Sequence, residues 1–118
     1  MNTIESIRQI ALSLPGVAES VSYGTPSFKL KDKLLARFHE DGVNLVLKMD
    51  ADTRDFYMQA NPERYYITDH YRGYPYVLVR LSEVDLDELT GHFRQLWKEH
   101  APKKLLRQHA AGEYGIDT

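Results

Sequence analysis

Cysteine is absent from the 118 residues of the chain. This absence excludes a thiol nucleophile, a disulfide framework and thiolate metal sites. No stretch approaches the roughly 18 consecutive apolar residues of a membrane helix, and residues 1–16 mix acidic and polar side chains with isoleucines, unlike a signal peptide. We therefore expect a cytoplasmic protein that does not contact a membrane.

An excess of positive charge is also missing. The chain has 15 lysines and arginines against 17 acidic residues, a formal net charge of −2. A dedicated nucleic-acid binder usually shows a basic excess, because much of its affinity comes from neutralised phosphates. Any DNA-binding role must therefore rest on a local basic patch.

Motifs of catalysis are absent as well. The sequence has no G-x-S-x-G elbow, P-loop or dinucleotide fingerprint. Its five histidines show no H-x-x-x-H or H-E-x-x-H spacing, and His92 and His100 lie more than two helical turns apart. Asp69 and His70 are adjacent, so in an extended segment their side chains point to opposite faces. We expect a non-enzymatic protein with no metal and no cofactor.

Helical and strand patterns are present along most of the chain. Asn2 and Glu5 form a capping pattern that starts the first helix, and Asp50 caps the second. Apolar residues at helical spacing predict helices over 4–14, about 51–60 and 86–98, with a short helical turn at 102–109. Alternation and turn residues predict strands over 28–30, 34–39, 44–49, 64–68 and 76–81.

This order of elements predicts an α+β fold. The first three strands are joined by tight turns at 32–33 and 41–42, so they form an antiparallel meander. We expect two layers, an antiparallel five-stranded sheet with the helices packed on one face. The whole chain, 1–118, is expected to be a single domain with its core at about 4–106 and a polar tail at 107–118.

Period-two alternation sorts the strand residues onto two faces. The inward set is apolar: Phe28, Leu30, Leu34, Ala36, Phe38, Leu45, Leu47, Met49, Val77, Val79 and Leu81. The outward set mixes cations with apolar and aromatic residues: Lys29, Leu35, Arg37, His39, Val46, Lys48, Tyr76, Leu78 and Arg80. A register slip of one residue would exchange the two sets.

Three interpretations of the outward face remain open. It can bind DNA weakly and in a salt-dependent way, because cations meet phosphates and rings stack on bases. The candidate contacts are Lys29, Lys31, Arg37, Lys48, Arg72, Tyr74, Tyr76 and Arg80. Its cations can instead simply keep the strands soluble. Its apolar residues Leu35, Val46 and Leu78 can also meet a protein partner or a second copy of the chain.

The segment "TDHYRGYPYVLVRL", residues 68–81, gathers three tyrosines around Gly73 and Pro75. Tyrosine favours positions that are half apolar and half wet. The rings can form a small-ligand site around residues 69–76, or stack on bases while Arg72 meets a phosphate. They can also fold back over the edge of the core, which we expect for at least some of them.

Three blocks carry a family resemblance: "LPGVAESVSYGTPSFKLKDKLLARF", "HYRGYPYVLVRL" and "APKKLL". Together they resemble the MmcQ/YjbR family of small bacterial proteins, from about Ile4 to Leu106. The resemblance implies a two-layer fold like that of frataxin (CyaY-like) and of type III secretion chaperones. Members are commonly labelled DNA-binding, through a proposed double-wing arrangement of hairpins.

The residues that match the family pattern lie in all three blocks. They are Tyr23, Gly24, Thr25, Pro26, Phe28, His70, Tyr71, Gly73, Tyr74, Pro75, Val79, Leu81, Pro102 and Lys104. The chain departs from the pattern at Tyr71, where other branches have tryptophan, and at Leu35, where an aromatic residue is frequent. The second departure weakens the expectation that the outward face stacks on bases.

Overall fold

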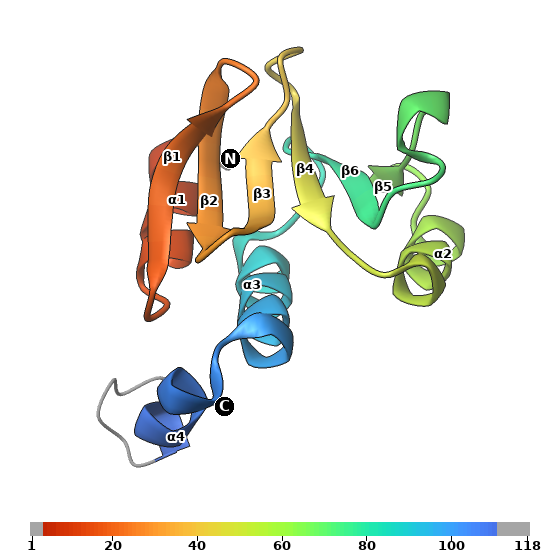
Figure 1. The fold of residues 1–118 in the computed structure, drawn as a ribbon. Coiled ribbons are helices and arrows are strands. Elements are labelled where there is room, and N and C mark those ends of the chain that lie inside the picture. The colour runs from red at the N-terminus through yellow and green to blue at the C-terminus, as the bar shows by residue number, and fades with distance from the viewer. Residues whose placement is uncertain (1–3, 111–118) are drawn as a thin grey trace.

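The computed structural model describes residues 4–110 and shows an α+β fold, with an antiparallel sheet and helices packed against it (Figure 1). The strands are β1 (Val17–Ser22), β2 (Thr25–Leu30), β3 (Lys33–Phe38), β4 (Asn44–Lys48), β5 (Tyr65–Tyr66) and β6 (Tyr76–Arg80). The helices are α1 (Ile4–Leu12), α2 (Ala51–Ala60), α3 (Leu86–His100) and α4 (Lys103–Ala110), with a 3-10 turn, η1, at Asp69–Tyr71. In the sheet the strand order is β1-β2-β3-β4-β6-β5.

The sheet has six strands and not the expected five, because the sequence analysis missed β1. This edge strand is mostly exposed and lacks the alternation that marks a half-buried strand. It pairs with β2 through a two-residue turn, Tyr23-Gly24, in which both residues have positive φ, 55° and 80°. Such turns usually carry Asn-Gly or Asp-Gly, so Gly24 and Pro26 indicated a turn, but the tyrosine in the first position did not indicate a hairpin.

The helices begin and end close to the expected positions. The Asp50 side chain accepts a hydrogen bond of 2.8 Å from the backbone N–H of Thr53 and so caps α2, as predicted. The other predicted cap residue, Asn2, and the tail from residue 111 onward lie outside the described residues. Within residues 4–110 no helix is both long and apolar enough to cross a membrane.

The main core lies between the sheet and helices α1 and α3; we call this side of the sheet the helix face. Phe28 packs edge-on against Phe38 and Phe93, with ring centroids 6.2 and 6.5 Å apart. Trp97 on α3 is buried, and its indole N–H donates to the carbonyl of Pro15 over 2.8 Å. This contact fixes α3 to the connection that follows α1.

A β-bulge corrects the sorting of faces in β3. Phe28 pairs with Ala36 and Lys29 pairs with Leu34, so Leu35 has no partner in β2. A bulge places one extra residue opposite a single partner and locally disturbs the alternation. As a result Leu35 is fully buried in the main core, and Leu34 lies on the other side of the sheet. The prediction for these two leucines was wrong, and Leu35 provides no evidence about stacking on the outward face.

Candidate functional site: the tyrosine pocket

The sheet side without helices is covered by the chain itself. The loop 67–75, which contains η1, folds back over it; we call this side the loop face. Tyr71 packs on Val46 and Leu78, each only 2% exposed. The patch predicted to receive a partner is therefore not exposed, since Leu35 lies in the main core and the other two residues lie under Tyr71. At least one ring of the tyrosine-rich segment has the structural role that we expected.

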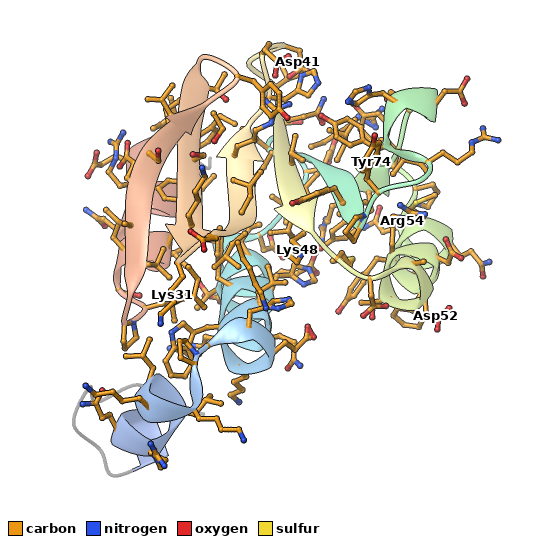
Figure 2. All side chains as sticks on the ribbon, viewed as in Figure 1. Lys31, Asp41, Lys48, Asp52, Arg54 and Tyr74 are labelled. Atoms are coloured by element: carbon orange, nitrogen blue, oxygen red, sulfur yellow. The ribbon has the colours of Figure 1, made fainter. Side chains whose placement is uncertain are left out.

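A buried arginine holds the loop in place. Arg54 on α2 donates through Nη1 to the carbonyls of Tyr74 at 2.8 Å, Tyr76 at 3.3 Å and Tyr71 at 3.4 Å. Figure 2 shows Arg54 beside the segment that carries Tyr74. Because the single guanidinium of Arg54 donates hydrogen bonds to three carbonyls, helix α2 fixes the backbone path of the loop.

Between the loop and the strands lies a cavity of about 480 Å³, which we call the tyrosine pocket. Its lining residues come from β3, β4, β6, two hairpin turns and the loop: Tyr23, Leu34, Arg37, His39, Glu40, Val46, Thr68, His70, Tyr71, Tyr74 and Tyr76. The rings of Tyr23 and Tyr74 are 79% and 58% exposed, so they are open to solvent at the rim of the pocket. His70 stacks on Tyr74 with ring centroids 6.1 Å apart.

Arg37 is the charged centre of this pocket. It is a buried residue of β3, and its Nη2 donates to the hydroxyl of Tyr71 over 3.1 Å. Its guanidinium carbon lies 4.7 Å from the ring centroid of Tyr23. Nη1 donates to the carboxylate of Glu40, and this hydrogen bond from Arg37 lowers the pKa of Glu40.

Tyr76 forms the side of the pocket nearest Lys48. Its hydroxyl lies 3.5 Å from the carbonyl of Leu34, and the Lys48 ammonium is 5.3 Å from its ring centroid. Burial, and to a smaller degree the nearby Tyr23, raises the pKa of Tyr76. The ring is therefore uncharged at neutral pH, and it offers a π-face to a ligand.

The structure divides the predicted DNA-contacting cations into two groups. Arg37 is paired with Glu40, and Arg72 is paired with Asp69 at 2.7 Å on an exposed turn. Arg80 lies 4.1 Å from the ring centroid of Tyr66 and donates to a backbone carbonyl over 3.1 Å. These three arginines already have partners within the chain.

The three lysines form the second group. No carboxylate within residues 4–110 forms an ion pair with Lys29, Lys31 or Lys48. Lys31 lies in the β2–β3 turn, and Figure 2 shows it at the opposite end of the sheet from Asp41 of the β3–β4 turn. The predicted cations therefore do not form a continuous unpaired strip.

The family-pattern residues lie in different parts of the molecule. Tyr23, His70, Tyr71 and Tyr74 line the pocket. Four shape the backbone around it: Gly24 in the β1–β2 turn, Pro26 in β2, and Gly73 and Pro75 in the loop. Others, such as Phe28 and Val79, lie in the main core.

Sequence reasoning did not select Glu40, Thr68 or Leu34 as site residues, although all three line the pocket. The pairing of Arg37 with Glu40 had no signal in the sequence, because side chains three residues apart in an extended segment point to opposite faces. The change of face at Leu34 had no signal in the sequence.

A second polar cluster joins β5 to α3, away from the pocket. The Tyr65 hydroxyl donates to the carboxylate of Glu88 and lies 2.7 Å from Nε2 of His92, while Arg64 pairs with Glu88 at 2.9 Å. Burial and the bond to Glu88 raise the pKa of Tyr65. Burial lowers the pKa of His92, although Glu88 opposes the change. Burial alone would raise the pKa of Glu88, but hydrogen bonds from Tyr65 and Arg64 outweigh it and lower that pKa. The cluster thus holds a neutral histidine between two secondary-structure elements.

Neither cluster contains a set of metal ligands. Across residues 4–110 no three histidine, aspartate or glutamate side chains are grouped so that they could hold an ion. The tyrosine pocket presents aromatic rings, hydroxyl groups, two imidazoles, the carboxylate of Glu40 and the guanidinium of Arg37.

Comparisons with known proteins agree with the resemblance seen in the sequence blocks. The YjbR family model matches residues 12–99. Uncharacterised proteins of Mycobacterium bovis and Mycobacterium tuberculosis are 33% identical over 75 residues, which is 64% of this chain and 50% of each relative. The chain thus spans about half the length of these curated relatives.

A solved structure shares the fold. The crystal structure of the Deinococcus radiodurans protein DR2400, which carries the domain DUF419, matches with a TM-score of 0.71 and 23% identity. The match covers 99% of this chain and 91% of that protein. At this identity the comparison supports the fold alone.

Proposed function

The chain belongs to the YjbR family, and we propose that it is a non-enzymatic module whose tyrosine pocket binds a planar, ring-bearing ligand. One observation carries the proposal: a cavity of about 480 Å³ is lined by four tyrosines and a buried arginine. Ligand sites are typically concave, mostly apolar or aromatic, and supplied with a few fixed polar groups. The loop face has this composition.

The state of the rings supports the proposal. Tyr71 is fixed by packing and by its bond to Arg37, whereas Tyr23 and Tyr74 present most of their surface to solvent. Tyr23 has Arg37 against its ring and Tyr74 has His70, and a ligand ring can stack on the surface that these two rings still expose. The loop and the strands are already fixed before a ligand binds. Binding therefore costs less conformational entropy, which favours affinity.

A titration of the full chain with 2-naphthamide, a flat neutral probe, tests the proposal by amide chemical-shift changes. Shifts are expected at residues 23, 37 and 70–76. Tyr74→Ala should weaken binding about tenfold, because a stacked ring contributes roughly 1–3 kcal/mol. Tyr74 bonds to Tyr71, Tyr76 and Arg54 through its backbone N–H and carbonyl, so the loop should keep its shape in this variant.

Phe56→Ala is the matched control, since Phe56 is an equally large ring on α2, 65% exposed and outside the pocket. It should leave the affinity unchanged. Equal losses from the two variants, or shifts spread over the whole surface, would indicate nonspecific contact with exposed rings and contradict the proposal.

Weak binding of DNA is a second candidate function, and the unpaired lysines favour it. Lys29, Lys31 and Lys48 have no carboxylate partner within the described residues, and the exposed rings of Tyr23 and Tyr74 can stack on bases. Three phosphate contacts would give a salt dependence of roughly −3 in log K against log salt for duplex DNA. The pairing of Arg37 and Arg72 with carboxylates limits the contribution of the other cations.

Fluorescence anisotropy with single- and double-stranded oligonucleotides at low salt tests this candidate. Lys48→Ala should weaken binding and reduce the salt slope by about one. Lys98→Ala, an exposed lysine on α3, serves as the control and should have little effect. Absence of binding at low salt, or equal effects of the two variants, would remove DNA as a ligand of this face.

A further inference from the structure

Arg37 differs from the other arginines of the sheet in how it is held. Its side chain is 7% exposed, and neutral groups provide most of its contacts: the Tyr71 hydroxyl, the Tyr23 ring and the carbonyl of Phe38 at 3.4 Å. Only one contact is anionic, the carboxylate of Glu40. Removing the anionic partner of a buried ion pair is strongly unfavourable, because it leaves an uncompensated charge on the guanidinium.

Glu40, in contrast, is held only weakly by the fold. Its side chain is 56% exposed, and it lies in the turn between β3 and β4. Among the described residues, only the side chain of Arg37 forms a hydrogen bond or ion pair with the Glu40 carboxylate. An exposed carboxylate regains full hydration when it moves into water, so its departure has little desolvation penalty.

The pair of Arg64 and Glu88 shows the opposite arrangement within the same chain. Glu88 is 31% exposed, and Tyr65 donates a second hydrogen bond to it. That carboxylate accepts hydrogen bonds from two side chains, Arg64 and Tyr65, whereas the Glu40 carboxylate accepts from one side chain, Arg37. The comparison identifies Glu40 as a carboxylate that an incoming anion can replace.

Charge beside the pocket favours the same exchange. If Glu40 moves away, Arg37 is left without an anion, and Lys48 lies 5.3 Å from the Tyr76 ring with no ion pair within the described part of the chain. A ligand carboxylate can accept two parallel bonds from a guanidinium, and such charge-assisted bonds are about twice as strong as neutral ones. The rings of Tyr23 and Tyr74 then receive the aromatic part of the ligand.

We infer that the ligand of the tyrosine pocket is an aromatic carboxylate, whose acidic group takes the place of Glu40 on Arg37 while its ring stacks on the tyrosines. This inference rests on the proposed function and adds the chemical class of the ligand. Glu40 acts as an internal placeholder that keeps Arg37 paired when the pocket is empty.

Three probes with one ring system test the inference on the full chain: 2-naphthoate, 2-naphthamide and 2-naphthylmethylammonium. By isothermal titration calorimetry we expect naphthoate to bind about tenfold more tightly than the amide, and the ammonium probe to bind most weakly. Arg37→Met should remove the preference for naphthoate. Because that variant also loses the bond to Tyr71, its folding is checked by urea unfolding.

Glu40→Gln provides the sharper test, since it removes the competing carboxylate from an exposed position. The affinity for naphthoate should rise about tenfold, whereas the affinity for naphthamide should stay the same. Glu83→Gln is the matched control: it changes the net charge by the same amount on an exposed turn outside the pocket, and it should affect neither probe.

The outcomes separate the inference from the proposed function. Equal binding of naphthoate and naphthamide, or equal effects of Glu40→Gln on both probes, overturns the inference and leaves the ring-binding pocket standing. Tightest binding of the ammonium probe would also overturn the inference and leave the ring-binding pocket standing. If no naphthyl probe binds, both proposals fail.

Discussion

The two faces of the sheet are closed by different kinds of contact. On the helix face, buried side chains of five strands and of helices α1 and α3 fill the space, and Phe28 meets two other rings edge-on. On the loop face, one short loop covers two strand residues, and hydroxyl and guanidinium groups complete the closure. The loop face leaves a cavity of about 480 Å³, whereas the cavity beside α3, lined in part by Met49 and Leu96, has a volume of about 210 Å³. We therefore expect substitutions on the helix face to change mainly the unfolding free energy, and substitutions on the loop face to change mainly ligand binding.

Phe93→Ala should have the largest effect on folding, because it empties the centre of the helix face. Truncation of a fully buried phenylalanine costs about 3–5 kcal/mol of unfolding free energy. Urea unfolding measures the loss, with Phe56→Ala as a surface control expected to stay within about 0.5 kcal/mol. A loss below 1 kcal/mol for Phe93→Ala would mean that the helix face does not dominate stability.

Arg54→Met should have the next largest effect, on the loop face. It removes the donor that holds three carbonyls of the loop, for an expected cost of about 1.5–3 kcal/mol. Hydrogen exchange should accelerate at residues 71–76 and binding of 2-naphthamide should weaken. Arg94→Met, on the exposed surface of α3, is the control. Unchanged exchange in the loop would show that Arg54 does not anchor it.

Acidification should weaken the β5–α3 contact. Burial lowers the pKa of His92 in the folded state, so the unfolded chain binds more protons as the pH falls through about 6.5. Unfolding free energy should therefore decrease between about pH 7 and the lowered folded-state pKa and then level off. The facing groups are Glu88 on α3, Tyr65 on β5 and Tyr57 on α2.

Urea unfolding across this pH range checks the expectation. His92→Gln should reduce the slope, whereas His70→Gln, at an exposed position, should not. Part of the decrease of unfolding free energy on acidification should remain in His92→Gln, because burial and the nearby Lys33 also lower the pKa of His100. Stability that increases on acidification would contradict the assignment of a neutral His92.

Tyr71→Phe should have a smaller effect, about 0.5–1.5 kcal/mol, since the ring still covers Val46 and Leu78 and only the bond to Arg37 is lost. Tyr74→Phe removes a hydroxyl from an exposed ring and should be neutral. Urea unfolding measures the unfolding free energy of both variants. The difference between the two values gives the contribution of the hydrogen bond between Arg37 and Tyr71 to the closure of the loop face. Identical stabilities would assign that closure to ring packing alone.

Tyr23→Asn should be slightly stabilising, although it removes part of the pocket. Asparagine suits the positive φ of the first turn position better than tyrosine does, and we expect a gain of up to about 1 kcal/mol. Binding of 2-naphthoate should weaken at the same time. Lys31→Asn, at the other turn residue with φ of 55°, should give a similar gain without affecting binding. A loss of stability in Tyr23→Asn would show that its contact with Arg37 outweighs the turn strain.

Much of the helix face could be predicted from the sequence. Period-two and helical spacing identified Phe28, Leu45 and Val79 as core residues, and the cap of α2 was found from Asp50 alone. These features depend on local patterns that repeat over several residues. The loop face depends on contacts between distant segments, so its assembly had no local signal.

The errors have equally physical causes. The bulge at Leu35 is one extra residue in a single strand, which alternation cannot detect before the strand pairing is known. Strand β1 was missed because its exposed edge position does not require an apolar pattern. The residues of the candidate pocket were identified only in part: four tyrosines, His70 and Arg37 were selected from the sequence, but the pairing with Glu40 and the burial of Val46 and Leu78 were not.

The position of Trp97 has a practical consequence. It is the chain's single tryptophan, and it is 1% exposed among the residues of the helix face. Its emission should report whether that packing is intact and should respond little to occupancy on the opposite side. Absorbance from the tyrosine rings, by contrast, should be sensitive to a bound ligand. One optical experiment can therefore follow unfolding and ligand binding as two separate signals in the same sample.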